Sequence, residues 1–398
     1  MSLSLNPCLE RLTDYPFARL RSLLDGVDPP ENITPLVLSI GEPQHRPPKI
    51  ITEILSRDLA LWGKYPLTEG TPEFRAAAGG WLKRRFGLRS FDAESQILPA
   101  AGTREALFMA ASLAVPRDYG GKAPAVLVPN PFYHVYCGAA LAAGAEAVFL
   151  TASKETGFLP DLDGLNEALL ARTALLILCS PSNPQGAVAD LDYLKKAVTL
   201  ARRYDFILAS DECYCEIYDR APPAGALQAC EDLGEGYANV LVFQSLSKRS
   251  SAAGLRSGFI AGDAALIAAF KKLRSYGAAT VPLPVLAASA ALWDDDEHVA
   301  GNRALYRAKL DAAEEILGGC FGFFRPGGGF FLWLDVGNGE AATKKLWAEA
   351  GLRVLPGAYL SRPGPEGTTP GDSFIRVALV HDLDTTREAL ARIRKVLF

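Results

Sequence analysis

Short apolar runs recur between residues 125 and 261, and stretches with helical spacing separate them. The runs occupy 125–128, 147–150, 175–178, 206–209, 240–243 and 258–261. Continuous apolar runs of this length are typical of parallel strands buried on both faces, and the helices between them supply the crossover connections. The pattern therefore predicts an α/β fold in which a mostly parallel sheet is sandwiched between helices.

The pattern changes after residue 281, where a charged helical stretch runs from 294 to about 317. A strand pattern at 329–335, a helix at 341–350 and a strand at 373–379 follow, which indicates a smaller α+β domain. Near the N-terminus, helical spacing over residues 6–24 is interrupted at Pro16 and leads to a short strand at 36–40. We expect an N-terminal arm with part of the small domain at 1–47, a large domain at 48–281 and a small C-terminal domain at 282–398.

Charge and hydropathy argue against several classes of partner. The chain holds 41 Lys and Arg against 45 Asp and Glu, so it has no basic excess to neutralise a nucleic-acid backbone. Its longest weakly polar stretch, 277–293, is too short to cross a bilayer comfortably and contains Pro282 and Pro284. Glu10, Arg11 and Asp14 interrupt the place where a secretion signal needs an apolar run. We expect no nucleic acid, no membrane and a cytoplasmic location.

The cysteines and histidines show no metal-binding spacing. The seven cysteines contain no CxxC pair, and such an odd set fits reduced thiols in the cytoplasm. The four histidines, His45, His134, His298 and His381, lie far apart in the sequence, which favours surface or packing roles. No metal site is expected.

The densest cluster of reactive side chains is Ser245-Leu-Ser247-Lys248, with Arg256 eight residues after the lysine. It directly follows the predicted strand 240–243, and α/β sheets bind ligands at the carboxyl ends of their strands. A lysine with a neutral amine can form a Schiff base, while the two hydroxyls and Arg256 can hold a phosphate. The alternative is an ordinary solvated loop.

Two further polar segments follow neighbouring predicted strands. Asp211 and Tyr214 come after 206–209, and Asn183 lies in a proline-rich turn after 175–178. A carboxylate at a strand end can pair with a protonated pyridine nitrogen, and the Tyr214 hydroxyl and Asn183 amide can donate to a phenolate oxygen. Taken alone, Asp211 is equally compatible with a helix cap, and Asn183 with a plain turn.

Three weaker signals lie nearer the N-terminus. Gly102-Thr103-Arg104 reads as a tight turn that opens a helix, whose free N–H groups suit a phosphate. Tyr133 follows another strand end, where an aromatic ring can stack on a planar cofactor, and Tyr65 lies in an exposed-looking loop. The ordinary alternatives are a capped helix, core packing and a turn.

Arg376 lies among apolar residues in the predicted strand 373–379. An unpaired guanidinium is costly to bury, so Arg376 needs an anionic partner. A carboxylate that accepts hydrogen bonds from both arms of the planar guanidinium is the natural choice. Arg376 is therefore expected to bind an anion, most naturally a carboxylate.

Taken together and in their order along the sequence, these motifs resemble the class I/II aminotransferases of the pyridoxal-phosphate fold-type I superfamily, from about residue 36 to the C-terminus. The resemblance implies a pyridoxal 5'-phosphate cofactor bound in the large domain, transamination between an amino acid and a 2-oxo acid, and a homodimer with shared active sites. It implies that Lys248, Asp211 and Tyr214 are catalytic. It assigns the substrate carboxylate to Gly41, Asn183 and Arg376. It assigns the cofactor to Gly102, Thr103, Arg104, Tyr133, Asn183, Asp211, Tyr214, Ser245, Ser247, Lys248, Arg256 and, from the neighbouring subunit, Tyr65.

Flanking segments resemble the succinyldiaminopimelate aminotransferases of lysine biosynthesis in particular: 6–17, 39–43, 102–107 and 354–360. The implied substrate is N-succinyl-LL-2,6-diaminopimelate with 2-oxoglutarate, and His45 and Arg46 are the preferred candidates for its distal anionic groups. The alternatives are a class I aminotransferase for aspartate, alanine or aromatic amino acids, a C–S β-lyase built from the same residues, and a non-catalytic cofactor-binding regulator. Gln185 and Ala101 depart from the family pattern, which more often has Thr and a polar residue there.

Overall fold

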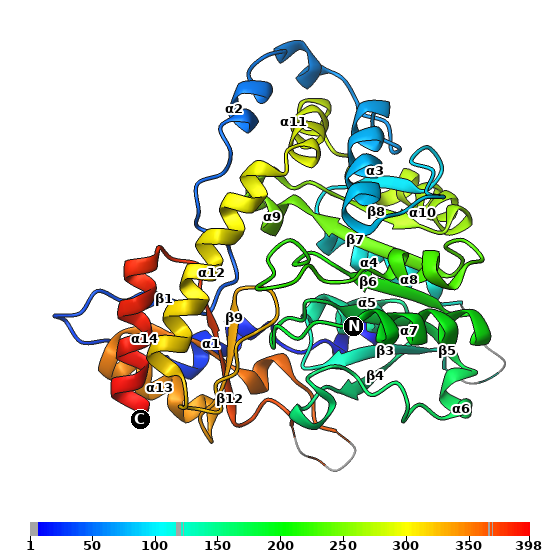
Figure 1. Cartoon of the computed structure of the whole chain (residues 1–398). Helices are drawn as coiled ribbons and strands as arrows, with labels where there is room; N and C mark the ends of the chain where they lie inside the picture. The colour runs from blue at the N-terminus through cyan, green and yellow to red at the C-terminus, as the bar shows by residue number, and fades with distance from the viewer. Residues whose placement is uncertain (1–6, 117–120, 122, 365–366, 368) are drawn as a thin grey trace, which may run out of the picture.

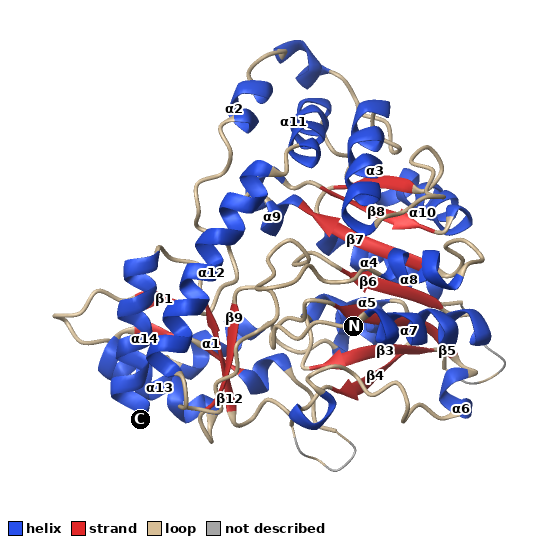
Figure 2. Cartoon of the chain, viewed as in Figure 1, coloured by secondary structure: helices blue, strands red, loops and turns tan. Residues whose placement is uncertain are grey.

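The computed structural model describes residues 7–116, 121, 123–364, 367 and 369–398, and a seven-stranded sheet dominates it (Figures 1 and 2). The order is β2-β8-β7-β6-β5-β3-β4. The strands are β2 (Ile97–Ala100), β3 (Ala125–Asn130), β4 (Glu146–Thr151), β5 (Thr173–Cys179), β6 (Ile207–Asp211), β7 (Val240–Ser245) and β8 (Gly258–Gly262). The run from β4 to β7 is parallel, whereas β8 is antiparallel to both β7 and β2. The predicted, mostly parallel sheet is confirmed.

Helices cover both faces of this sheet, and successive strand residues alternate between two cores. On β6, Leu208 packs into one core and Ala209 into the other. One face carries α3 (Pro72–Phe86), α7 (Leu191–Tyr204), α8 (Ala226–Leu233) and α11 (Leu283–Asp294). The other carries α4 (Thr103–Ala114), α5 (His134–Ala142) and α10 (Ala264–Gly277). Burial on both faces explains why the strand segments are apolar throughout.

A smaller unit surrounds an antiparallel sheet in the order β11-β12-β9, formed by Leu355–Pro356, Phe374–Ala378 and Phe331–Asp335. Beside it, β1 (Leu36–Val37) pairs in parallel with β10 (Leu352–Arg353). The helices α12 (Glu297–Leu317), α13 (Gly339–Ala350) and α14 (Leu383–Leu397) share one core with this sheet through Leu310, Leu346 and Leu390. A second, smaller α+β unit is therefore present, as the sequence pattern predicts.

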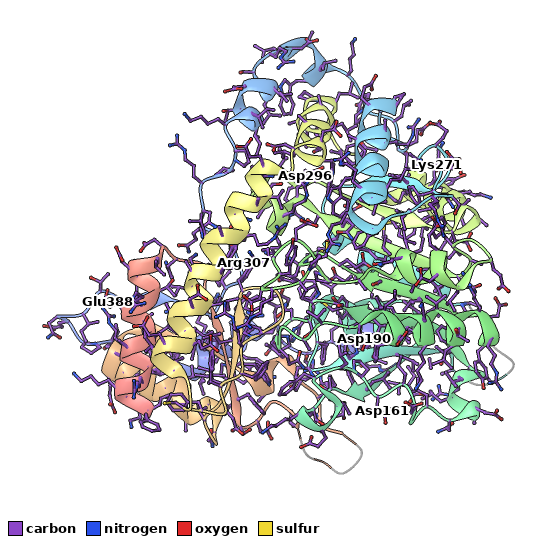
Figure 3. All side chains as sticks on the ribbon, in the orientation of Figure 1. Asp161, Asp190, Lys271, Asp296, Arg307 and Glu388 are labelled. Atoms are coloured by element: carbon purple, nitrogen blue, oxygen red, sulfur yellow. The ribbon has the colours of Figure 1, made fainter. Side chains whose placement is uncertain are left out.

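The long helix α12 connects the two units (Figure 1). In Figure 3, Asp296 marks the residue just before α12 and Arg307 its middle. Arg303 of α12 forms an ion pair with Glu216 of the loop after β6, whereas Leu310 packs in the small core. By contrast, the side chains of α11 lie in the core of the large sheet. We propose that the small domain begins with α12 and not at residue 282.

Two segments show how proline affects the sequence pattern. The sequence analysis did not predict β2, which contains Pro99; β2 is an edge strand, where a missing N–H is tolerated. In the arm, a 3₁₀ helix at Pro7–Arg11 and α1 (Pro16–Leu23) are separate, because Pro16 opens α1. Residues 1–6 of the predicted arm lie outside the described residues. In the part of the chain that the structure describes, no helix is both long and apolar enough to cross a membrane.

Candidate active site

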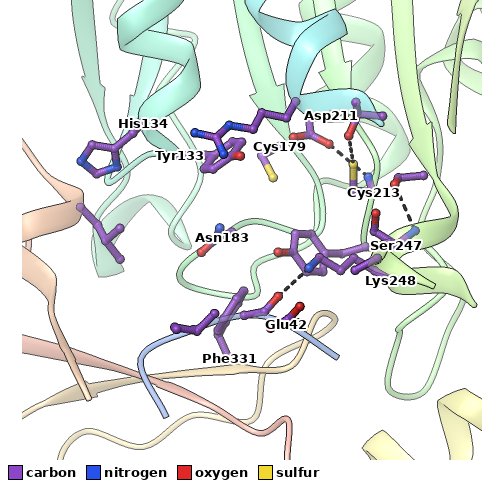
Figure 4. Close-up of a pocket in the computed structure, with 18 of the residues that line it drawn as sticks. Glu42, Tyr133, His134, Cys179, Asn183, Asp211, Cys213, Ser247, Lys248 and Phe331 are labelled. Carbon is purple, nitrogen blue, oxygen red and sulfur yellow. Dashed lines mark hydrogen bonds between the residues drawn. The ribbon is translucent and has the colours of Figure 1, made fainter. Parts of the chain in front are cut away.

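A pocket of about 500 Å³ lies where β5, β6 and β7 end (Figure 4). The loops and strand ends there supply Asn183, Asp211 and Lys248 to its wall. The small sheet supplies Phe331 and Arg376, and residues 15–17 and 40–42 line it from the N-terminal segment. The pocket therefore lies between the two units, and it brings together residues that the sequence separates by more than 300 positions, such as Gly41 and Arg376.

Lys248 lies on α9 (Leu246–Arg249), a single turn directly after β7. The Ser245 hydroxyl caps this turn by accepting the Ser247 N–H at 3.1 Å. The Lys248 Nζ donates to the Gly41 carbonyl at 2.5 Å, as Figure 4 shows. Burial lowers the pKa of Lys248 to about 8, so its amine is neutral more often than an exposed lysine's. A nucleophilic amine needs this property.

Asp211 is the last residue of β6 and is buried. One carboxylate oxygen accepts a hydrogen bond from the Tyr136 hydroxyl at 2.6 Å, and the other accepts the Cys213 N–H at 3.2 Å. Burial raises the pKa of Asp211, while these hydrogen bonds lower it. The next α-helix begins only at Ala226, so the helix-cap interpretation of Asp211 is wrong. A firmly held carboxylate at the pocket wall can pair with a protonated ring nitrogen.

Arg376 on β12 points toward the same pocket and is 5% exposed. Its guanidinium donates to Asn183 Oδ1 at 2.9 Å and to the Ser39 carbonyl at 2.6 Å, and it lies 4.3 Å from the Phe331 ring centre. Its Nε is buried without a hydrogen-bond partner. Burial lowers the pKa of Arg376 to about 10, so it remains charged at neutral pH. No carboxylate of the described residues pairs with it, which leaves it free to bind an anion.

Gly41 brings the N-terminal segment close to Arg376. A Cβ at this position would lie 2.5 Å from Phe331 Cζ, so a larger residue would displace the ring under the Arg376 guanidinium. Glycine at position 41 thus allows its carbonyl to reach Lys248.

The start of α4 forms a cradle with Arg256. Gly102 precedes the helix with φ of 82°, and a Cβ there would lie 2.1 Å from Arg256 Nη2. Thr103, Ser245 and Ser247 line the pocket beside Arg256. Free N–H groups at a helix start, hydroxyls and a guanidinium together suit a phosphate.

The remaining predicted residues separate into two groups. Tyr133, Tyr214 and Arg104 line the pocket, and burial raises the pKa of both tyrosines, so their hydroxyls remain protonated hydrogen-bond donors. Tyr65 does not line the pocket, because its side chain is 100% exposed in the loop before α3.

Neither His45 nor Arg46, the residues predicted to bind the distal anionic groups, lines the pocket. Both ring nitrogens of His45 are instead engaged by α12, through Asn302 at 2.8 Å and Lys309 at 2.6 Å. Arg46 is exposed. The N-terminal segment thus contributes Gly41 and Glu42 to the pocket and directs His45 elsewhere.

Several pocket residues were not predicted from the sequence, above all Tyr136, Phe331 and His134. Tyr136 lies three residues after Tyr133, the N-cap of α5, and the two rings meet edge to face with centres 5.6 Å apart, so the short spacing was an available signal. His134 lines the pocket, where burial and the charge of Arg362 lower its pKa to about 3. Among the described residues, no group of three or more His, Cys, Asp or Glu could hold a metal ion.

The chain belongs to the family of class I and II aminotransferases, whose model matches residues 33–393. An aminotransferase structure from Neisseria meningitidis is 43% identical, has a TM-score of 0.94, and the match covers 99% of this chain and 100% of that one. A 4-dedimethylamino-4-oxo-anhydrotetracycline transaminase from Streptomyces rimosus is 32% identical, over 89% of this chain and 92% of its own. An LL-diaminopimelate aminotransferase from Syntrophobacter fumaroxidans is also 32% identical, over 84% of each chain.

The protein is therefore a transaminase of fold type I that depends on pyridoxal 5'-phosphate. The pocket fits the three functional groups of this cofactor. The cradle at Gly102 and Arg256 matches its phosphate, the buried Asp211 carboxylate matches its ring nitrogen, and the Lys248 amine matches its aldehyde.

Proposed function

We propose that this transaminase moves the amino group of a long, multiply anionic amino acid of the N-succinyl-LL-2,6-diaminopimelate type to 2-oxoglutarate. The charge of the pocket carries the proposal. Among the described residues that line it, four cations face two anions: Lys248, Arg104, Arg256 and Arg376 against Glu42 and Asp211. The cofactor phosphate carries about two negative charges and cancels most of this excess at the Arg256 cradle, but Arg104 and Arg376 remain at the pocket wall to bind two substrate carboxylates. The relative named as an LL-diaminopimelate aminotransferase supports this substrate class.

Lys248 carries the proton transfer. With pyridoxal phosphate bound, Lys248 would hold the cofactor through its aldehyde, and its free amine would accept the proton from the substrate Cα. Bound pyridoxal phosphate supplies an electron sink for the charge that develops at Cα. Asp211 keeps the ring nitrogen protonated, and Tyr136 fixes the orientation of Asp211. Asn183 and Tyr214 donate hydrogen bonds to the phenolic oxygen.

The remaining pocket residues hold the two substrates in place. Gly102, Thr103, Ser245, Ser247 and Arg256 bind the phosphate, and Tyr133 covers the ring face. Arg376 binds the substrate α-carboxylate next to Gly41, so that the Cα–H bond is presented to Lys248.

Arg104 is our candidate for the distal anionic group in place of His45 and Arg46. Its side chain is exposed at the pocket wall, and its guanidinium lies 5.7 Å from the ring centre of Tyr15 of the arm. The sequence motif assigns Arg104 to the phosphate, but Arg256 already occupies the cradle at Gly102. Arg104 is therefore free to serve the second carboxylate.

We also propose a homodimer, in which Tyr65 reaches the phosphate of the partner. The segment at 59–67, beside α2 (Ile50–Leu55) in Figure 1, is unusually apolar for a surface. Leu59 is 69%, Trp62 50%, Tyr65 100% and Leu67 66% exposed. Clustered apolar side chains of this kind mark an interaction surface, and a second copy of the chain is the occupant that we propose.

The test of the substrate compares kcat/KM for N-succinyl-LL-2,6-diaminopimelate with values for LL-diaminopimelate, aspartate, alanine and phenylalanine, all with 2-oxoglutarate. We expect the succinylated substrate to be preferred at least tenfold, which is about 1.4 kcal/mol of transition-state discrimination. Equal turnover of aspartate or phenylalanine would reduce the proposal to a general class I aminotransferase.

The Arg104→Ala variant tests the distal site, with Arg46→Ala as the matched control outside the pocket. We expect Arg104→Ala to lower the preference for the succinylated substrate about tenfold while cofactor retention stays unchanged. Loss of cofactor retention with an unchanged preference would instead place Arg104 at the phosphate.

A further inference from the structure

Lys309 of α12 is a buried amine that the proposed reaction does not use. It is 1% exposed, and among the described residues it forms no ion pair with a carboxylate. Its Nζ contacts His45 Nε2 at 2.6 Å and donates to the Leu379 carbonyl at 3.2 Å. Burial lowers the pKa of Lys309 to about 8. Burying a protonated amine without an anionic partner costs free energy. We therefore expect the hydrogen bonds of Lys309 to serve a purpose in the protein.

The hydrogen bonds of Asn302 determine which group donates and which accepts in the series of hydrogen bonds that begins at Lys309. The Asn302 amide nitrogen donates to the backbone carbonyls of Lys248 and Arg249, both at 3.1 Å, which fixes Oδ1 as the acceptor. His45 Nδ1 must then carry the proton that it donates to Oδ1 at 2.8 Å. Burial lowers the pKa of His45, so the ring is neutral and its Nε2 accepts from Lys309. The order is Lys309 to His45 to Asn302 to the Lys248 backbone.

This chain of hydrogen bonds touches three segments that form the active site. Asn302 binds the turn that carries Lys248, and His45 lies four residues after Gly41, whose carbonyl accepts from Lys248. Leu379 lies three residues after Arg376, just beyond the end of β12. Each of the three segments comes from a different part of the sequence. Lys309 bonds directly to the segment after Arg376 and to His45, and it reaches the Lys248 turn through His45 and Asn302.

The same face of α12 also supports the wall below Lys248. Asn302, Tyr306 and Lys309 are spaced four and three residues apart, which places them on one side of the helix. The Tyr306 ring stacks on Phe330 at 5.1 Å, and the Phe330 ring centre lies 5.5 Å from Lys248 Nζ. The packing of α12 and its hydrogen bonds therefore act on the same region.

We propose that Lys309 is a positioning residue, which acts through His45 and Asn302 to hold the Lys248 turn, the Gly41 segment and the Arg376 strand in one geometry. This inference rests on the proposed role of Lys248, but Lys309 holds the three segments in the apoprotein as well as in the protein with its cofactor. Loss of the Lys309 amine would release the Gly41 segment and admit water to Lys248.

The main test measures the pKa of Lys248 in the apoprotein by competitive acetylation at a series of pH values, with the labelled peptide quantified by mass spectrometry. In Lys309→Met we expect this pKa to rise by about one unit, because a more hydrated amine is less strongly desolvated. Lys345→Met is the matched control, since Lys345 is exposed and donates only to the Val396 carbonyl. An unchanged Lys248 pKa in Lys309→Met would overturn the proposal.

A double-variant cycle on kcat/KM tests whether the residues act as one unit. We expect Lys309→Met and Asn302→Ala each to lower kcat/KM about tenfold. The kcat/KM of the double variant should be no lower than that of the less active single variant. Losses that multiply would show two independent roles and would overturn the proposal. Lys309→Arg retains hydrogen-bond donors, so the Lys248 pKa in this variant should lie close to the wild-type value. If Lys309→Met does not fold, Asn302→Ala replaces it in the labelling test.

Borohydride trapping separates this inference from the proposed function. A cofactor trapped on a lysine other than Lys248 would refute the role of Lys248, whereas the acetylation experiment follows the Lys248 amine whether or not the cofactor attaches there. The two failures therefore give different results.

Discussion

The two walls of the active-site pocket are built in different ways. On the large sheet, β5, β6 and β7 are adjacent and parallel, so backbone hydrogen bonds bring Asn183, Asp211 and Lys248 to one edge. The opposite wall joins Gly41, Phe331 and Arg376 from segments that do not pair with that sheet, and side-chain hydrogen bonds hold it. In the proposed function, the first wall carries the groups that react, while the second orients the substrate and depends on the packing of the small unit, which includes α12.

Removing Lys248 tests the reacting wall most severely. We expect Lys248→Ala to lower the transamination rate by at least about 1,000-fold, because the proton at the substrate Cα loses its acceptor. The cofactor should still bind noncovalently through the phosphate cradle, and the thermal unfolding midpoint should change little. In the wild type, borohydride reduction should fix the cofactor on the peptide with Lys248. A label on Lys309, the other buried amine with a pKa of about 8, would contradict the assignment.

A change at Asp211 should have the second-largest effect. Asp211→Asn removes the negative charge beside the ring nitrogen, so the nitrogen loses its proton and the ring withdraws electrons poorly. We expect the single-turnover rate to fall about 100-fold and cofactor affinity to fall much less. Tyr136→Phe keeps the charge and removes one hydrogen bond, so a loss of about tenfold is expected. Equal losses in the two variants would show that the orientation of Asp211 matters as much as its charge.

The contrast between the walls also explains which features were predictable from the sequence. Lys248, Asp211 and Asn183 each follow an apolar run, and the geometry of parallel strands alone brings them together. His45, Asn302 and Lys309 could not be found in this way, because His45 lies 257 and 264 residues from its two partners. Their contacts depend on the packing of α12, which no local pattern encodes.

The same reasoning applies to the fold itself. The period of the strands predicted the large sheet, and the change of pattern near residue 281 predicted the smaller α+β unit. Pro99 concealed the edge strand β2, and the apolar helix α11 gave no local sign of which core it joins. Burial of α11 against the large sheet is a property of tertiary packing, and our proposed boundary at α12 rests on it.

Besides the two walls, the proposed partner subunit is a third contributor to the active site, through Tyr65. A Tyr65→Phe chain mixed with a Lys248→Ala chain should give hybrid dimers in which one site holds both lesions and the other holds none. We expect the intact site to show wild-type cofactor affinity and about half of the wild-type activity per dimer. Tyr65→Phe homodimers should bind the cofactor about tenfold more weakly, because a hydrogen bond to a charged group is lost. Hybrids with one lesion in each site would show that Tyr65 acts within its own subunit.

The smallest effect that we expect concerns the pH dependence of stability on the α12 side. The pKa of Lys309 is about 8 in the folded protein, below the ordinary value of 10.5. Between these values the unfolded chain holds a proton that the folded chain has released, so the folded state gains stability as the pH rises. The groups that face the amine do not titrate in this interval: His45 has a pKa below 6.5, Asp382 has a pKa below 3.8, and Tyr306 has a pKa raised above 10.0 by burial.

In urea unfolding of the apoprotein, the stability of wild type relative to Lys309→Met should therefore rise by about 1–3 kcal/mol from pH 8 to pH 10.5, at up to about 1.4 kcal/mol per pH unit. From pH 7 to pH 8 it should rise by less than about 0.5 kcal/mol, because the folded amine is still mostly protonated there. A relative stability that is flat across the whole range would show that Lys309 keeps its proton when the protein folds, and the amine would then donate to His45 as a full ammonium ion at every pH where the enzyme is folded.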